Sequence, residues 1–172
     1  MIQILKLIIT QRPKDGFLGG PKNKSFSLCH NSINYTLNIR QLGERQITIE
    51  TIEGGTTKDI LEIYYSLETL LMLLDGQFYP VVSAFENDIE ITHSWERRTL
   101  PSYRSADFMI GTGNVLVDFS EVLESQLFYN WLNLREELDL IHKMVLYCLS
   151  SVKMPKDMQC AFMAEAFIGL SE

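Results

Sequence analysis

The spacing of the hydrophobic residues changes along the chain, and this change constrains the fold more than any other feature. Between residues 33 and 53 hydrophobic and polar residues alternate, the pattern of a β-strand with one buried face. From Ser120 onward the hydrophobic residues recur at helical spacing. We therefore predict an α+β protein, with a β-rich domain at residues 1–119 and a helical segment at residues 120–172.

Two alternating segments predict a β-hairpin, preceded by a short strand at residues 25–29. Residues 33–40 and 45–53 both alternate, and Gln41-Leu42-Gly43-Glu44 between them has the composition of a turn. Because this connection is short, the two strands are expected to be antiparallel, with one face in water. The core face of the first segment would hold Ile33, Tyr35, Leu37 and Ile39.

Further strands are predicted on both sides of this hairpin. Residues 2–10 are rich in Ile and Leu on both faces, which favours a central strand covered on two sides. Residues 78–94 predict a second hairpin, with a turn at Asn87-Asp88 and alternation through His93. Residues 96–118 are interpreted as an irregular connector, with a short strand at 115–119.

One long helix is predicted within the β-rich domain, at about residues 57–74. Gly54-Gly55 ends the preceding strand, Thr56 or Thr57 can cap the helix, and Asp59 lies in its first turn. The broad apolar face predicts that this helix packs across the sheet. That face consists of Ile60, Leu61, Tyr64, Leu67, Leu70, Leu71 and Leu74.

The last part of the chain predicts three helices, at residues 120–132, 131–151 and 155–170. The third is hydrophobic around most of its circumference, and a helix of this kind needs neighbours. It is buried in this chain, paired with a second copy, or continued by further sequence of a larger helical domain. The sequence favours the last two alternatives, so we expect a homo-oligomer formed through the C-terminal helices.

The composition predicts a cytoplasmic protein without membrane contact. The 172 residues are 46% hydrophobic, enough for a sizeable core, and no run approaches the ~20 apolar residues of a membrane span. Residues 1–10 fit a strand better than a signal peptide. The net charge of −7 disfavours nucleic-acid binding unless basic residues cluster.

Neither the cysteines nor the histidines predict a metal site, and no motif implies a cofactor. Cys29, Cys148 and Cys160 are widely spaced without a Cys-x-x-Cys pair, so we expect buried free thiols in a reducing compartment. His30 and His93 have no Ser, Cys or Asp partner at a meaningful spacing, so an exposed or hydrogen-bonded role is expected for each.

Arg135 and His142 form the one candidate catalytic pair. Seven residues are nearly two helical turns, so on one helix both would share a face, about 10 Å apart. In the Arg-x(4–6)-His signature of ribonucleases the His transfers protons and the Arg holds phosphate. The alternative is a solvated charged face on which Arg135 pairs with Asp139. The sequence favours this alternative, because Glu136 and its neighbouring glutamate would repel a phosphate.

Aromatic and basic residues between positions 95 and 104 form a candidate ligand or phosphate contact. Trp95 can stack on a base or a sugar, and Arg97, Arg98 and Arg104 can pair with phosphate. The alternative is a loop that packs on the sheet and leaves its charges in water, and the sequence favours it.

Two stretches resemble a known family. Ser105-Ala106-Asp107-Phe108 and Trp131-Leu132-x-Leu134-Arg135-Glu136-Glu137-Leu138-Asp139-x-Ile141-His142 resemble bacterial proteins with a β-rich N-terminal region followed by a HEPN domain, the ApeA-type antiphage proteins and their relatives. The resemblance implies a β region that senses or binds, and a helical domain that dimerises and cuts RNA with an Arg-x(4–6)-His motif.

The candidate motif departs from the family pattern. A polar Asn, Asp or His usually follows the family's arginine, whereas Glu136 follows Arg135 here, and the family motif usually falls later in the helical domain. If the resemblance holds, the chain is the sensor region plus the opening helices of a HEPN domain, without the nuclease motif proper.

The expected function is a non-enzymatic recognition or regulatory module of a bacterial intracellular protein, with phage defence as the context that the resemblance implies. RNA and protein are both open as ligands. The alternatives are a HEPN-like ribonuclease using Arg135 and His142, and a structural assembly subunit.

Overall fold

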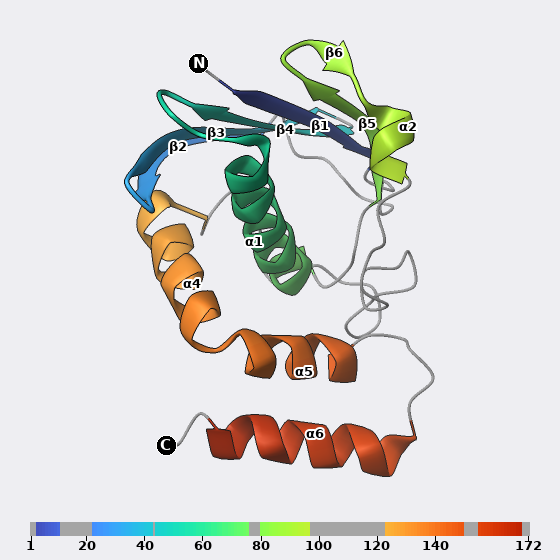
Figure 1. Ribbon diagram of the computed structural model, residues 1–172. Coiled ribbons are helices and arrows are strands. Elements are labelled where there is room, and N and C mark those ends of the chain that lie inside the picture. The colour runs from blue at the N-terminus through green and yellow to red at the C-terminus, as the bar shows by residue number, and fades with distance from the viewer. Residues whose placement is uncertain are drawn as a thin grey trace.

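Six antiparallel strands form one sheet, followed by helices towards the C-terminus, in the computed structural model of the chain (Figure 1). This α+β architecture confirms the fold class expected from the sequence. The structure describes residues 3–10, 22–42, 44–75, 80–96, 123–149 and 155–169. Its elements are β1 (Ile4–Thr10), β2 (Lys22–His30), β3 (Ile33–Leu42), β4 (Glu44–Thr51), α1 (Thr57–Asp75), β5 (Val81–Glu86), β6 (Ile89–Glu90), α2 (Thr92–Glu96), α4 (Ser125–Glu137), α5 (Asp139–Leu149) and α6 (Lys156–Gly169).

The strand order is β2-β3-β4-β1-β5-β6, which places β1 inside the sheet between β4 and β5. The predicted central position of this strand is confirmed. Its Leu5, Leu7 and Ile9 are buried, whereas Ile4 and Ile8 on the opposite face are only half-buried. The second covering layer that we predicted is not found among the described residues, because α1 and α4 both lie on the same side of the sheet (Figure 1).

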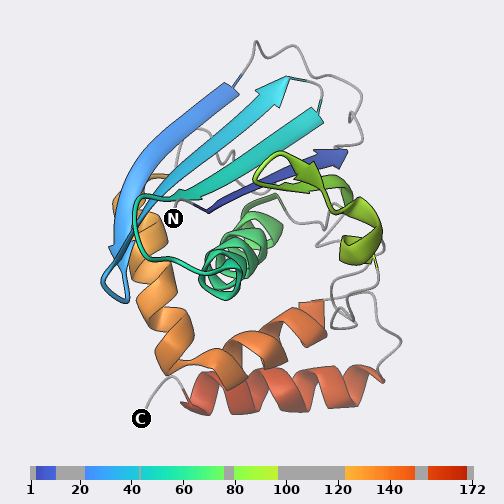
Figure 2. The same ribbon diagram turned by 45° about the horizontal axis from the view of Figure 1, so that its top comes forward.

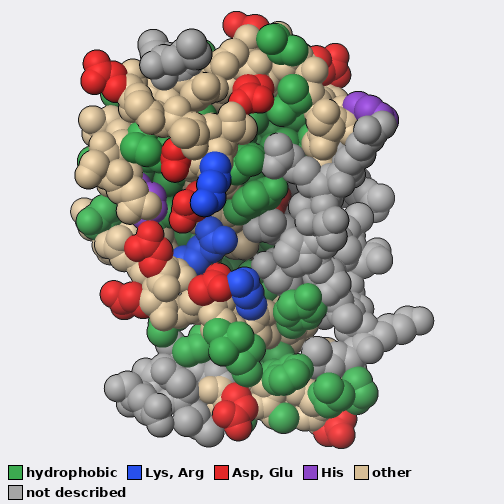
Figure 3. Space-filling view, viewed as in Figure 1, with side chains coloured by type: hydrophobic (Ala, Val, Ile, Leu, Met, Phe, Trp, Pro, Cys, Tyr) green, Lys and Arg blue, Asp and Glu red, His purple; other side chains and the backbone are tan. Residues whose placement is uncertain are grey.

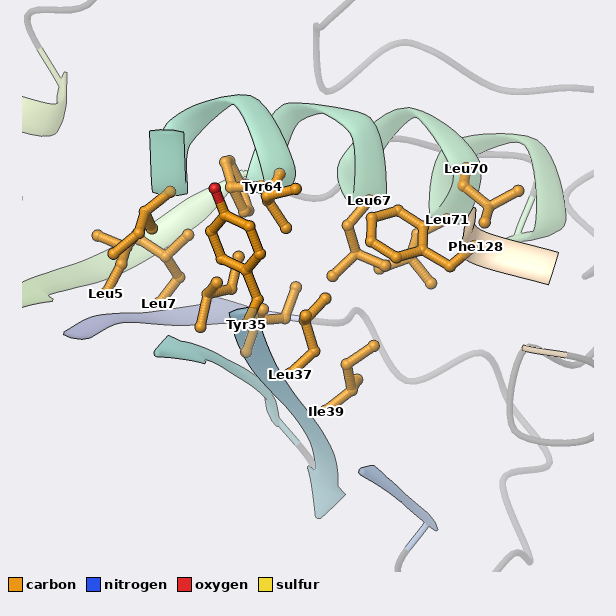
Figure 4. Close-up of a cluster of buried hydrophobic side chains, with 14 of the residues drawn as sticks. Leu5, Leu7, Tyr35, Leu37, Ile39, Tyr64, Leu67, Leu70, Leu71 and Phe128 are labelled. Atoms are coloured by element: carbon orange, nitrogen blue, oxygen red, sulfur yellow. The ribbon is translucent and has the colours of Figure 1, made fainter. Parts of the chain in front are cut away.

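The core lies between the sheet and α1. Alternate residues of β3 point towards the helix, and Tyr35, Leu37 and Ile39 are at most 1% exposed, as predicted. Figure 4 shows these side chains on the face of the sheet that is turned to α1, from which Tyr64 and Leu67 point back towards the sheet. Full burial of one such side chain contributes about 1.5–3 kcal/mol, so this layer dominates the stability of the fold.

The predicted hairpin of β3 and β4 is confirmed, with both strands extending into the predicted turn. Leu42 pairs with Glu44, and Gly43 between them lies outside the described residues. β4 ends at Thr51, and the following Ile52 is 53% exposed rather than in the core.

Two adjacent glycines lead from β4 into α1. Gly54 has a φ of 74°, a conformation that glycine adopts without strain. A Cβ on Gly55 would lie 2.4 Å from the Thr51 Cγ2 atom, so a side chain does not fit there. The hydroxyl of Thr56 then donates to Asp59 Oδ2 over 2.6 Å and accepts from the Asp59 N–H over 3.4 Å. These bonds confirm Thr56 as the residue that caps the helix, whose first residue is Thr57.

The second predicted hairpin is confirmed, but it is shorter than expected. Asn87 and Asp88 form its turn with positive φ angles of 49° and 65°. The alternation predicted through His93 is wrong, because β6 has only two residues and α2 begins at Thr92. The Thr92 hydroxyl accepts the Ala84 N–H over 3.1 Å, a bond that a longer strand would supply from its backbone.

The three predicted C-terminal helices are confirmed with shifted bounds. α4 packs on α1 and on β2, where the rings of Phe26 and Phe128 lie 6.1 Å apart. Leu138 ends α4 and interrupts the helical conformation. α5 then runs in another direction and packs against α6, away from the sheet (Figures 1 and 2). The predicted strand at 115–119 and the predicted domain boundary at 119/120 lie outside the described residues.

Exposure of the thiols differs from the prediction. All three cysteines are free, as expected, but Cys29 and Cys160 are exposed and Cys148 is half-buried. Cys29 faces outward because it alternates with buried Leu28 and His30 on β2. Within the described residues, no helix has the length and apolar character needed to cross a membrane.

Candidate functional site

A polar pocket lies where the end of β2, the first half of α1 and the end of α4 meet. Its volume is about 190 Å³. Figure 3 shows acidic and basic side chains close together over the region where α1 and α4 meet. The pocket is lined by His30, Glu62, Ser66, Leu132, Arg135, Glu136 and Asp139.

His30 reaches the pocket from the core face of β2. It follows Phe26 and Leu28 on that face, and the next two residues, Asn31 and Ser32, form the turn with φ angles of 49° and 62°. The imidazole is only 7% exposed, and its Nε2 lies 3.2 Å from Glu136 Oε1. The alternation of Phe26, Leu28 and His30 in the sequence indicates that His30 lies on the core face of the strand. It does not indicate the partner of the histidine, because Glu136 lies more than a hundred residues away.

Two glutamates place negative charge beside this histidine. Glu62 and Glu136 are both exposed, and one carboxylate oxygen of each lies with the ring nitrogen of His30 in a group whose members are within 4.8 Å of one another. Burial in the neighbouring core raises the pKa of Tyr35 to about 12, and the nearby Asp59 and Glu62 carboxylates add to this effect. The two carboxylates beside His30, rather than the burial of Tyr35, favour positive charge in this part of the pocket.

Arg135 ties α4 to α1. Its Nη1 donates a hydrogen bond to the hydroxyl of Ser66, a side chain that is 1% exposed. One turn earlier on α4, the Trp131 indole donates to the Ser66 carbonyl over 2.8 Å. The predicted pairing of Arg135 with Asp139 is wrong, because Asp139 pairs with Lys143 on α5. Arg135 therefore has a hydrogen-bond partner within the protein, the buried Ser66 of α1.

Arg135 and His142 do not share a helix. Arg135 lies on α4 and His142 on α5, and the helix is interrupted at Leu138, whose φ and ψ are −121° and 31°. The predicted common helical face is therefore wrong. The side chain of His142 lies outside the described residues.

Trp95, the aromatic candidate for ligand stacking, packs against α1. Its side chain is 7% exposed, and its ring centroid lies 5.3 Å from that of Tyr64 and 6.4 Å from that of Tyr65. These contacts occupy the ring within the core. Arg97, Arg98 and Arg104 lie outside the described residues, so the predicted contact with phosphate stays a prediction.

Comparisons with protein-family models, with curated proteins and with solved structures find no match to this chain. The chemistry of the pocket therefore follows from its own residues. An imidazole and two carboxylates can together bind a cation or the cationic group of a ligand, whereas they repel a phosphate.

Proposed function

We propose that this chain is a non-enzymatic recognition or regulatory module that forms a homodimer through its C-terminal helices. The observation that carries the proposal is the exposure of α6. Not one described side chain of this helix is buried, although nine of the fourteen residues in its sequence KDMQCAFMAEAFIG are hydrophobic. Soluble monomers rarely leave a continuous apolar surface of this kind in water, and such surfaces often mark sites of protein–protein contact.

The exposed surface suits a second copy of the same chain. The segment 158–164 of α6, MQCAFMA, contains no charged residue, whereas the whole chain carries a net charge of −7. Two copies could therefore pack these segments about a twofold axis with no charged residue in the centre of the contact. Figure 3 shows hydrophobic side chains gathered over the α5–α6 part of the molecule.

The pocket supports a role without RNA cleavage. Arg135 is engaged with Ser66, and Glu62, Glu136 and Asp139 bring negative charge to the place where a phosphate would have to bind. These charges favour a protein over RNA as the ligand of the module. The bacterial setting and the link to phage defence rest on the resemblance at residues 105–108 and 131–142 alone, whereas the intracellular setting rests on the composition of the chain.

The dimer is tested by sedimentation velocity over a range of concentrations. Wild-type chain is expected to sediment as a dimer, and Met158→Glu on α6 as a monomer, because burial of a carboxylate in an apolar interface is strongly unfavourable. Val82→Glu on β5 is the matched control, since Met158 and Val82 are both 46% exposed. A wild-type monomer at every concentration, or equal behaviour of the two variants, contradicts the proposal.

The absence of enzymatic activity is tested with labelled RNA. Wild type and His142→Ala are expected to leave the RNA equally intact. Cleavage by the wild type that the His142→Ala variant lacks would replace our proposal by the ribonuclease alternative.

A further inference from the structure

We infer that His30, Glu62 and Glu136, brought together from β2, α1 and α4, form a binding site for one divalent transition-metal ion such as Zn²⁺. This inference goes beyond the proposed recognition function and does not depend on dimerisation. One imidazole nitrogen and two carboxylate oxygens are a ligand set that suits Zn²⁺ and related ions.

The distances fit such a site. In a tetrahedral zinc site with bonds of about 2.0–2.1 Å, neighbouring ligand atoms are about 3.3 Å apart. His30 Nε2 and Glu136 Oε1 already lie 3.2 Å apart. All three ligand atoms are within 4.8 Å of one another, and the exposed Glu62 side chain can close the remaining gap by rotating about its own bonds.

The backbone around the site is held in place. His30 is buried at the end of β2, beside a tight turn, so its ring has little freedom. Trp131 and Arg135 both bond to Ser66, which fixes the part of α4 that carries Glu136 against the part of α1 that carries Glu62. The ion therefore has to order only the two exposed glutamate side chains and not the backbone that carries them.

The charges around the site favour a cation. Three carboxylates line the pocket against one guanidinium, that of Arg135, which hydrogen-bonds to the neutral Ser66 hydroxyl; Asp139 pairs with Lys143, and Glu62 and Glu136 lie close together beside His30. A divalent cation would neutralise both.

Three protein ligands leave at least one coordination position open. The adjoining pocket of about 190 Å³ has room for water or for a small ligand on the metal. This is the arrangement of zinc sites that bind an exchangeable group, rather than that of closed structural sites with four protein ligands.

Asn31 competes with the metal for the histidine. Its Nδ2 lies 3.2 Å from His30 Nε2, so the amide can donate to the lone pair that a metal would use. Asn31 is exposed and has a φ of 49°, a conformation that glycine adopts readily. Replacing it by glycine removes the competing donor without straining the turn.

Calorimetric titration of the full chain with ZnCl₂ tests the site. We expect one ion per chain, with affinity lowered on the order of 100-fold in His30→Gln and in Glu136→Gln, since loss of a ligand exceeds the loss of an outer partner. Glu137→Gln is the matched control, because Glu137 adjoins Glu136 on α4 and does not line the pocket. Asn31→Gly is expected to bind Zn²⁺ more tightly than wild type.

Cobalt substitution distinguishes this site from the thiols. The Co²⁺ form is expected to show visible d–d bands without a sulfur-to-metal charge-transfer band, because no cysteine is a ligand. Circular dichroism checks that each variant is folded. Unchanged zinc affinity in His30→Gln, equal losses in Glu136→Gln and Glu137→Gln, or a thiolate band in the cobalt spectrum would each overturn the inference.

Discussion

Helices α1 and α6 have similar mean hydropathy, yet one is the centre of the core and the other lies at the surface. In α1 the residues Ile63, Tyr64 and Leu67 are completely buried, whereas no described side chain of α6 is buried. The difference lies in what each helix faces. α1 lies under a sheet whose alternate residues match its apolar face, whereas among the described elements α6 packs chiefly against one helix, α5 (Figure 2). Hydrophobic content alone therefore does not determine burial; a complementary surface is also required.

The largest effect on stability is expected from shortening a buried side chain of α1. Leu67→Ala should lower the free energy of unfolding by about 2–5 kcal/mol, because it removes a fully buried side chain and leaves a cavity. Leu140→Ala is the same substitution at a residue of α5 that is 71% exposed, and it should cost less than about 0.5 kcal/mol. Urea unfolding followed by circular dichroism measures both. Equal losses of unfolding free energy in the two variants would show that the α1 core and the surface of α5 contribute equally to stability, contrary to the prediction.

A smaller effect on the free energy of unfolding is expected at α4, which lies between α1 and the pair of helices α5 and α6. Ser66→Ala removes the acceptor of Arg135 and should lower the free energy of unfolding by about 1–3 kcal/mol. A double-mutant cycle with Arg135→Ala should show that the two losses are not additive. Lys143→Ala is the control, because it breaks an exposed ion pair with Asp139 worth at most about 0.5 kcal/mol. Additive losses would mean that Arg135 does not hold α4 to α1.

The start of α1 should show a dependence on pH that comes from its Thr56 cap. Hydrogen bonds from the Thr56 hydroxyl and N–H lower the pKa of Asp59, so its stabilising effect is present above the ordinary carboxyl pKa and is lost as pH falls through the lowered value. Asp59→Asn should cost about 0.5–1 kcal/mol at neutral pH and nothing in strong acid.

Asp157→Asn, which also removes an aspartate from the first turn of a helix, α6, is the control for this cap. A dependence on pH of equal size in both variants would show that helix position, rather than the Thr56 cap, determines the effect. Thermal unfolding between pH 2 and 7 makes the comparison.

The smallest effect concerns reactivity rather than stability. Burial, with a contribution from the neighbouring Cys160, raises the pKa of Cys148, so this thiol has less thiolate near neutral pH. Iodoacetamide should therefore modify Cys148 severalfold more slowly than the exposed Cys160, as followed by mass spectrometry of the peptides. Protection of Cys160 that grows with protein concentration would add support for a dimer through α6, and equal rates for the two thiols at low concentration would contradict the prediction.

The sequence predicted those parts of the fold whose signals are local. The alternation of Tyr35, Leu37 and Ile39, the Thr56 cap and the Asn87-Asp88 turn each depend on residues a few positions apart, and each is confirmed. The prediction failed where a contact between residues more distant in the sequence determines the local conformation. A strand pattern through His93 stops because Thr92 bonds to Ala84, which the local pattern does not show.

The candidate pocket could not be predicted, because its ligands come from three distant elements. The sequence shows no Ser, Cys or Asp partner for His30 at a meaningful spacing, whereas in space its Nε2 lies 3.2 Å from Glu136 Oε1. Glu62 and Glu136 look like ordinary solvated charges on helical faces. Their meeting depends on α4 folding back on α1 and β2, which neither periodicity nor composition encodes.

The position of β1 between β4 and β5 has a consequence for synthesis on the ribosome. β1 is the first of the described strands to be made, and about 70 residues separate its end from the start of β5. At about 5–20 residues per second, both edges of this apolar strand are satisfied only after roughly 4–14 s. Until then Ile4–Thr10 resembles an unprotected edge strand, which is prone to pair with other chains. During synthesis β1 is thus exposed to aggregation, although it lies inside the sheet of the folded protein.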